Sequence, residues 1–113
     1  MDESVIKHLE RQQVGTMKLS HAIKEGSKIR PQCYGALAKQ GKTCALGAAY
    51  EFYFGELPQD GNRILDYFRL RTVWPELGRP YGPNRDLEQF ITMLADCAMT
   101  REQVADEIEA QGY

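Results

Sequence analysis

Residues 44–54, Cys44-Ala45-Leu46-Gly47-Ala48-Ala49-Tyr50-Glu51-Phe52-Tyr53-Phe54, form the most apolar stretch of the chain. The small residues come first and the aromatic residues last, so another backbone can approach one end while large rings fill space at the other. Thr43 can cap the start of a helix here, and Gly55 can end it. A helix that is apolar on most faces is normally central to a small core. We therefore expect residues 44–54 to form the central helix.

A second helix is predicted over residues 86–98 by its hydrophobic period. Apolar side chains recur there at the spacing of one helix face, and they are Leu87, Phe90, Ile91, Leu94, Ala95 and Ala98. This spacing is a strong amphipathic signature. Asn84 or Asp86 can cap the start of the helix.

A third helix is predicted over residues 100–110. Thr100 and Gln103 form a capping box, a pair that satisfies the free N–H groups at a helix start. One face of this segment is apolar, with Val104, Ala105 and Ile108 expected to point inward. The other face is acidic, with Glu102, Asp106, Glu107 and Glu109 expected to face water. The short join to the preceding helix predicts an angled helix pair.

Two further helices are predicted over residues 20–29 and 62–71. Ser20 can cap the first, and Pro31 stops it because a proline disfavours helical geometry in the residue before it. Its expected apolar contacts are Ala22, Ile23 and Ile29. In the second helix, we expect Ile64, Leu65 and Phe68 to face inward and Arg63, Asp66 and Arg69 to face outward.

The remaining segments are shorter or irregular. The Gln40-Gly41 pair is a turn signal and predicts a small hairpin within residues 32–44. Residues 72–84 are rich in proline and glycine, so we expect a loop that its apolar residues, Trp74, Leu77 and Tyr81, pin to the core. Residues 2–14 carry a short apolar stripe and predict a helix that Gly15 ends.

Together these patterns predict a mainly α fold: one compact domain of about five short helices, with a possible small β-hairpin around residues 32–44. We expect residues 1–16 to be an N-terminal helical extension and residues 17–113 to be a single helical domain. The length of 113 residues fits one domain of ordinary size.

Composition limits the class of protein. Apolar residues make up 42% and charged residues 27% of the chain, the balance of a globular protein. No apolar run approaches the roughly 20 residues that a membrane-spanning helix needs. The first residues, Met1-Asp2-Glu3-Ser4, lack the basic and apolar regions of a signal peptide. We therefore expect a cytoplasmic protein without a membrane contact.

The three cysteines, Cys33, Cys44 and Cys97, argue against a disulfide framework because their number is odd. Neither histidine stands at metal-ligand spacing with a cysteine, so we expect no metal and no cofactor. If Cys44 lay in the first helical turn, the positive helix end would lower its thiol pKa, and His21 would be the candidate base. A cysteine-dependent enzyme is thus an alternative, although a buried Cys44 in a protein that is not an enzyme is favoured.

Charge is unevenly distributed along the chain, whose net charge is −2. Residues 1–42 hold eight basic and four acidic side chains, whereas residues 43–113 hold six basic and twelve acidic ones. An acidic helical surface raises the association rate with basic partners. We therefore expect binding to another protein through six carboxylates: Asp86, Glu88, Glu102, Asp106, Glu107 and Glu109.

Two alternatives involve other surfaces. A nucleic-acid regulator would contact phosphates through the basic residues of the first half, which are Lys18, Lys24, Lys28, Arg30, Lys39 and Lys42. Nucleic acid is the less favoured partner because the acidic last helix would repel phosphates. A homodimer could form through exposed parts of Tyr50, Tyr53 and Phe54, or through the 2–14 helix.

Three segments of the chain resemble a family of short bacterial and phage proteins that has no known activity. These segments are Lys18-Leu19-Ser20-His21-Ala22-Ile23 with Arg30-Pro31-Gln32, Cys44-Ala45-Leu46-Gly47-Ala48-Ala49-Tyr50-Glu51, and Thr100-Arg101-Glu102-Gln103-Val104-Ala105-Asp106. The resemblance implies a bacterial or phage accessory protein, with a host or bacterial protein as partner. It also implies that residues 1–16 are an extension, since relatives often start near Met17. Some relatives carry a cysteine pair in the region matching residues 78–85, which this chain lacks, so a metal role there does not carry over.

Overall fold

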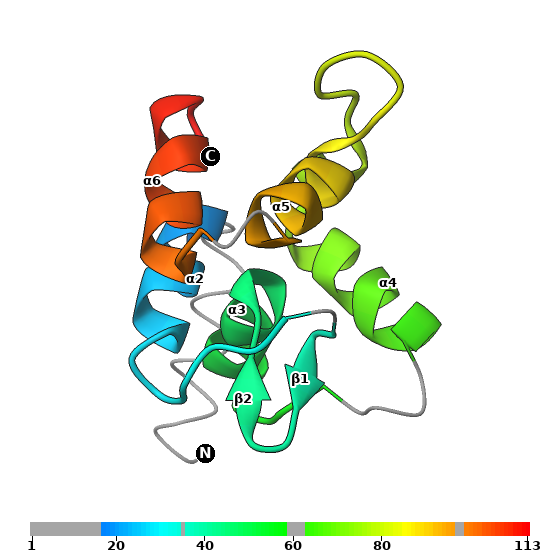
Figure 1. The fold of residues 1–113 in the computed structure, drawn as a ribbon. Helices are drawn as coiled ribbons and strands as arrows, with labels where there is room; N and C mark the ends of the chain where they lie inside the picture. Colours follow the sequence, from blue (N-terminus) through cyan, green and yellow to red (C-terminus); the bar gives the residue numbers. More distant parts are fainter. Residues whose placement is uncertain (1–16, 35, 59–62, 97–98) are drawn as a thin grey trace.

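The computed structural model of the chain describes residues 17–34, 36–58, 63–96 and 99–113. These residues form a mainly α domain with one small hairpin, as the sequence predicts (Figure 1). The elements are α2 (Leu19–Gly26), β1 (Ala38–Lys39), β2 (Lys42–Thr43), α3 (Ala45–Phe54), α4 (Arg63–Val73), the 3₁₀ turn η1 (Pro75–Gly78), α5 (Leu87–Asp96) and α6 (Arg101–Ala110). The predicted 2–14 helix lies outside the described residues.

Helix α3 lies at the centre of the core, and its small residues allow close approach of other backbones. A Cβ atom on Gly47 would overlap the carbonyl of Leu37, and one on Gly26 at the end of α2 would overlap the carbonyl of Ala48. The predicted role of the small residues is therefore confirmed. The aromatic end of α3 belongs to the core as well, since Tyr50 and Tyr53 are buried.

The sequence predicts the C-terminal end of α3 correctly but not its N-terminal cap. Gly55 ends the helix in the left-handed conformation, with φ of 76°, as expected. The prediction that Thr43 caps the start is wrong. Thr43 is buried in β2, and Cys44 is the N-cap, where its Sγ accepts a hydrogen bond of 3.4 Å from the backbone N–H of Gly47.

The predicted hairpin is present and pairs Ala38 with Thr43 and Lys39 with Lys42. Gln40 and Gly41 form the turn with φ of 51° and 74°, which fits a two-residue turn that matches strand twist. The chain before the hairpin also runs along β2. The N–H of Cys33 donates to the carbonyl of Thr43, and the N–H of Thr43 donates to the carbonyl of Pro31, both at 3.0 Å.

Helix α2 differs from its prediction at both ends. It begins at Leu19, so Ser20 is a buried residue inside the helix rather than its cap. The N–H of Ser20 donates to the backbone oxygen of Tyr113 at 3.3 Å, so the far end of the chain satisfies this group. The helix ends at Gly26, well before Pro31, and Ile29 is 50% exposed instead of packing inward. Ala22 and Ile23 are buried as predicted.

Helix α4 is rotated relative to its prediction. The expected inner residues are exposed, with Ile64 at 86%, Leu65 at 40% and Phe68 at 63%, whereas Asp66 is 2% exposed. The phenol of the buried Tyr50 explains this rotation, because a buried hydroxyl needs polar partners. Arg69 donates to the Tyr50 oxygen at 2.8 Å, and Asp66 is also hydrogen-bonded to Tyr50.

The segment after α4 is anchored as predicted, although it is not wholly irregular. Trp74 and Leu77 are buried, and Trp74 Nε1 donates to the carbonyl of Met17 at 2.9 Å. Residues 75–78 form the 3₁₀ turn η1, which corrects the prediction of a loop without regular structure. Pro75 at its start supplies a fixed φ that suits the first turn. Tyr81 is half-buried and packs on Phe90, with ring centroids 4.5 Å apart.

Helices α5 and α6 begin as the sequence predicts and lie at an angle to each other (Figure 1). Asp86 caps α5, since its Oδ1 accepts from the N–H of Gln89 at 2.8 Å. Thr100 and Gln103 form the capping box of α6. The apolar residues of α6 predicted to face inward are buried, and they are Val104, Ala105 and Ile108.

Arg101, in the first turn of α6, is buried and joins three parts of the fold. Its guanidinium donates to the carbonyls of Ser27 at 3.0 Å and Arg30 at 2.8 Å, and to Thr43 Oγ1 at 3.0 Å. Its backbone N–H donates to Oε1 of Gln32 at 3.2 Å, and Nε2 of Gln32 donates to the carbonyl of Met99 at 2.9 Å. One side chain thus connects α6 to the segment after α2 and to the hairpin.

We expect Arg101→Ala to lower the free energy of unfolding by about 3 kcal/mol, because it leaves several buried acceptors unpaired. Arg101→Lys should recover little, since one ammonium cannot reach the same set of acceptors. Urea unfolding measures both effects. Arg85→Ala, at a half-exposed arginine, is the control and should change stability by less than about 0.5 kcal/mol. A loss below about 1 kcal/mol for Arg101→Ala would contradict the assigned role.

The rotation of α4 predicts an unusual mutational pattern. Ile64→Ser and Phe68→Ser should each change the free energy of unfolding by about 0.5 kcal/mol or less, because their side chains face solvent. Leu70→Ala on the buried side of the same helix should cost about 2–5 kcal/mol. Thermal or urea unfolding of the three variants tests this, and a large loss for Phe68→Ser would show that this face is packed.

Candidate functional site

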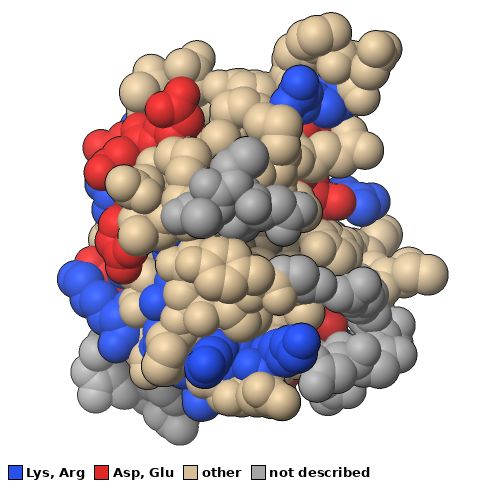
Figure 2. Space-filling model, viewed as in Figure 1, with Lys and Arg blue, Asp and Glu red and all other residues tan. Residues whose placement is uncertain are grey.

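The acidic α6 face consists of the exposed carboxylates Glu102, Asp106, Glu107 and Glu109. In Figure 2, acidic side chains gather on the side of the molecule where Figure 1 shows α6. The helix beneath them is held by the capping box at its start and by its buried inner residues. The carboxylates therefore project from a well-anchored backbone, as the sequence pattern predicts.

Lys24 of α2 lies against this face. Its ammonium forms ion pairs with Asp106 at 2.8 Å and with Glu109 at 2.7 Å, and these hydrogen bonds raise the pKa of Lys24. Within the part of the chain that the structure describes, Glu102 and Glu107 form no ion pair. The pKa of Glu102 is lowered, first by backbone N–H donation at the helix start and then by the Ser27 hydroxyl, so this carboxylate stays charged in mild acid.

The other two predicted carboxylates serve contacts within the fold. Asp86 caps α5. Glu88 receives two hydrogen bonds from Arg71, at 3.0 Å and 3.2 Å, and its side chain is 14% exposed. The structure therefore brings four of the six predicted residues together on α6 and gives Asp86 and Glu88 structural partners.

The six predicted basic residues also divide into groups. Nε of Arg30 donates to both carboxylate oxygens of buried Glu51, at 2.8 Å and 3.0 Å. Lys28 pairs with Glu25 at 3.1 Å, and Lys24 belongs to the acidic α6 face. The side chains left without an ion pair among residues 17–34, 36–58, 63–96 and 99–113 are Lys18, Lys39 and Lys42.

Lys39 and Lys42 form the basic hairpin patch, since they lie directly opposite each other on β1 and β2 and are both exposed. Figure 2 shows basic side chains in the lower part of the view, where Figure 1 places the hairpin. Like charges in direct cross-strand pairs repel each other, so this pair attracts an anion at some cost to hairpin stability. Lys18 lies apart from them, at the start of α2.

Cys44 and His21 do not form a nucleophile–base pair. Burial raises the pKa of Cys44 to about 11, which outweighs the lowering by the backbone N–H of Gly47. The expectation that the positive end of the helix lowers the pKa of the Cys44 thiol is therefore wrong. His21 is exposed, and its ring meets Phe52 edge-on at 6.0 Å. Among the described residues, no hydrogen bond joins Cys44 to His21.

Cys33 is buried, and its Sγ donates to the carbonyl of Ala36 at 3.4 Å. Burial raises the pKa of the Cys33 thiol, which nearby Arg101 and Lys39 lower only in part. Cys97 lies outside the described residues. Across the described ranges, no three His, Cys, Asp or Glu side chains converge in a way that could hold a metal ion, and no helix has the length and apolar character to cross a membrane.

Comparison of the chain with protein-family models, curated proteins and solved structures finds no match. The resemblance to short bacterial and phage proteins therefore stays a prediction from three sequence segments. A fold by itself does not define a function, which depends on the chemistry of the surface described above.

The raised pKa of Cys44 predicts slow alkylation. Since only the thiolate reacts, iodoacetamide should modify native Cys44 at neutral pH roughly a hundredfold more slowly than an unfolded cysteine, and the rate should rise about tenfold per pH unit below pH 11. Mass spectrometry of the labelled peptide measures this rate separately from Cys33 and Cys97. Rapid labelling of folded protein at pH 7 would instead support cysteine chemistry.

Proposed function

We propose that this chain is a non-catalytic protein-binding domain, an inhibitor or adaptor, and that the acidic α6 face contacts a basic surface of its partner. The observation that carries this proposal is the pair Glu102 and Glu107, two exposed carboxylates with no ion pair among the described residues, beside Asp106 and Glu109. Four carboxylates share this face with one ammonium, so it remains clearly acidic.

A fixed scaffold supports recognition through such a face. The buried guanidinium of Arg101 and the capping box of Thr100 hold the first turn of α6, and Val104 and Ile108 hold the rest of the helix against the core. Little backbone entropy would be lost on binding, so more of the interaction free energy contributes to affinity. Lys24 further orders Asp106 and Glu109 before a partner arrives.

The partner expected for this face presents lysine or arginine side chains. Carboxylates at the rim of an interface mainly accelerate association and select against acidic competitors, and both effects weaken as salt screens the charges. The resemblance to bacterial and phage proteins favours a protein of the bacterial cytoplasm as this partner.

A nucleic-acid-associated regulator is the second candidate, and the basic hairpin patch is the observation that favours it. Lys39 and Lys42 face each other without a carboxylate partner in the described part of the chain. Tyr34, 52% exposed, follows the segment that runs along β2 and offers an aromatic surface for base stacking. Two lysines give a weaker phosphate contact than most nucleic-acid binders use, so this candidate ranks below protein binding.

The primary proposal is tested with immobilised protein and bacterial lysate at low and high salt, followed by binding measurements with the purified captured protein. We expect binding that weakens with salt and falls at least tenfold in Glu102→Lys/Glu107→Lys. Glu56→Lys, a charge reversal at another exposed carboxylate, is the matched control and should bind like the wild type.

The outcomes separate the two candidates. A captured protein that binds the charge-reversed and control variants equally well would overturn the role of the acidic α6 face, as would the absence of any salt-sensitive protein partner. Capture of nucleic acid that Lys39→Glu/Lys42→Glu abolishes would replace the primary proposal with the second candidate.

A further inference from the structure

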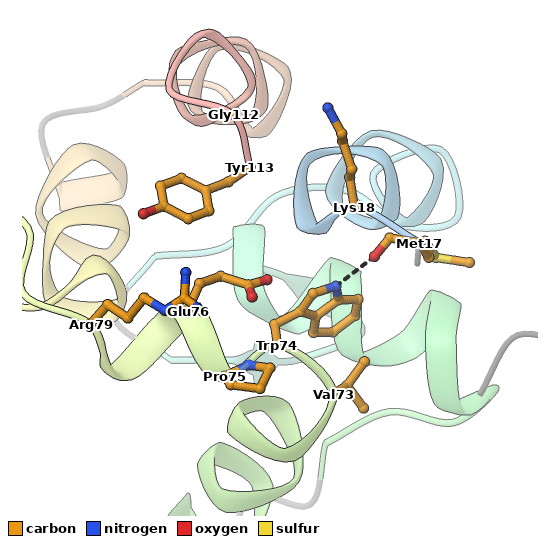
Figure 3. Close-up of a pocket in the computed structure, with 9 residues that line it drawn as sticks. All are labelled: Met17, Lys18, Val73, Trp74, Pro75, Glu76, Arg79, Gly112 and Tyr113. Carbon is orange, nitrogen blue, oxygen red and sulfur yellow. Dashed lines mark hydrogen bonds between the residues drawn. The ribbon is translucent and has the colours of Figure 1, made fainter. Parts of the chain in front are cut away.

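A pocket of about 410 Å³ opens between the start of α2, the turn η1 and the C-terminal residues of the chain (Figure 3). Its volume is within the range of small-molecule sites in proteins. Three segments far apart in the sequence form its wall, contributing residues 17–18, residues 73–76 with Arg79, and residues 112–113. The acidic α6 face and the basic hairpin patch supply none of its lining residues, so the pocket is a separate feature of the surface.

The apolar wall of the pocket is held in place by hydrogen bonds. Trp74 is almost fully buried, and its indole N–H donates to the carbonyl of Met17 across the wall, as Figure 3 shows. Tyr113 is half-buried, its ring lies 6.4 Å from that of Tyr81, and its backbone oxygen accepts from Ser20. Both aromatic side chains are therefore positioned without a ligand.

Three charged side chains complete the lining: Lys18, Glu76 and Arg79. Lys18 and Arg79 are exposed, and neither forms an ion pair among the described residues. Lys18 also occupies the N-cap position of α2, and its side chain makes no capping hydrogen bond. The positive end of that helix therefore adds to the local potential. Glu76 is half-buried and its carboxylate partly offsets the two cations.

We propose that this pocket binds a small molecule that combines a flat apolar body with a single anionic group, a carboxylate or a phosphate monoester. The flat body packs on the half-buried ring of Tyr113, with the buried Trp74 behind it in the wall, and the anion pairs with the exposed Lys18 and Arg79. The carboxylate of Glu76 would repel further negative groups on the ligand, so one anionic group is expected. A ligand N–H or O–H can donate to Glu76.

The side-chain N–H of Trp74 gives a direct test, because the chain contains one tryptophan and its indole peak in a ¹H–¹⁵N spectrum is unambiguous. The probes are 1-naphthylacetate, its uncharged analogue 1-naphthalenemethanol and the cation 1-naphthylmethylammonium, titrated into the full chain. We expect a saturable shift of the indole peak with naphthylacetate, roughly tenfold weaker binding of the alcohol, and the weakest binding of the cation.

Variants locate the charge contacts. Lys18→Gln and Arg79→Gln should each weaken naphthylacetate binding roughly tenfold and leave binding of the alcohol unchanged. Lys42→Gln removes the same charge from the basic hairpin patch and should have no effect. The backbone peaks of the same spectra show that each variant is folded.

Several results would overturn the proposal: no saturable shift of the Trp74 peak, equal binding of the three probes, or unchanged affinity in both Lys18→Gln and Arg79→Gln. If naphthylacetate binds as expected, a comparison of its affinity with that of 1-naphthyl phosphate shows whether the pocket prefers a carboxylate or a phosphate. Since none of these variants alters the acidic α6 face, the outcome is independent of the proposed protein binding.

Discussion

The buried guanidinium of Arg101 is the interaction on which the arrangement of this domain depends. A charged side chain in an interior is costly unless hydrogen bonds replace its hydration. Here the acceptors are the carbonyls of Ser27 and Arg30, which follow α2, and the side-chain oxygen of Thr43. Of the guanidinium nitrogens, Nε has no hydrogen-bond partner among the described residues. The charge thus satisfies acceptors that would otherwise be buried unpaired, and it connects the loop, the hairpin and α6.

This constraint also explains how the surface chemistry is arranged. Because α6 is held at its first turn, its acidic side chains keep a fixed orientation, and Lys24 of the neighbouring α2 meets two of them. The pocket depends on a second long-range contact, the hydrogen bond from Trp74 to Met17, which brings η1 to the start of α2. Charged faces and cavity are therefore products of contacts between distant segments.

The elements predicted well are those with local signals. The capping box of α6, the period of α5, the hairpin turn and the glycine that ends α3 each depend on residues within a few positions of one another. Predictions failed where a distant group decides the outcome. The Tyr50 phenol selects the polar face of α4. Ser20 was expected to cap α2, but it lies inside the helix, and its N–H donates to the backbone oxygen of the distant Tyr113. No local pattern distinguishes Arg101 from a surface arginine, and the pocket could not be seen in a single segment.

The hydrogen bond from the Ser20 N–H to the backbone oxygen of Tyr113 places the start of α2 beside residue 113, and Met17 and Tyr113 line the same cavity. Two positions that lie this close can be joined by a short peptide linker with little distortion, which is the condition for circular permutation. A permuted form of residues 17–113 would join residue 113 to residue 17 through such a linker and open the chain in an exposed connection such as Gln40-Gly41.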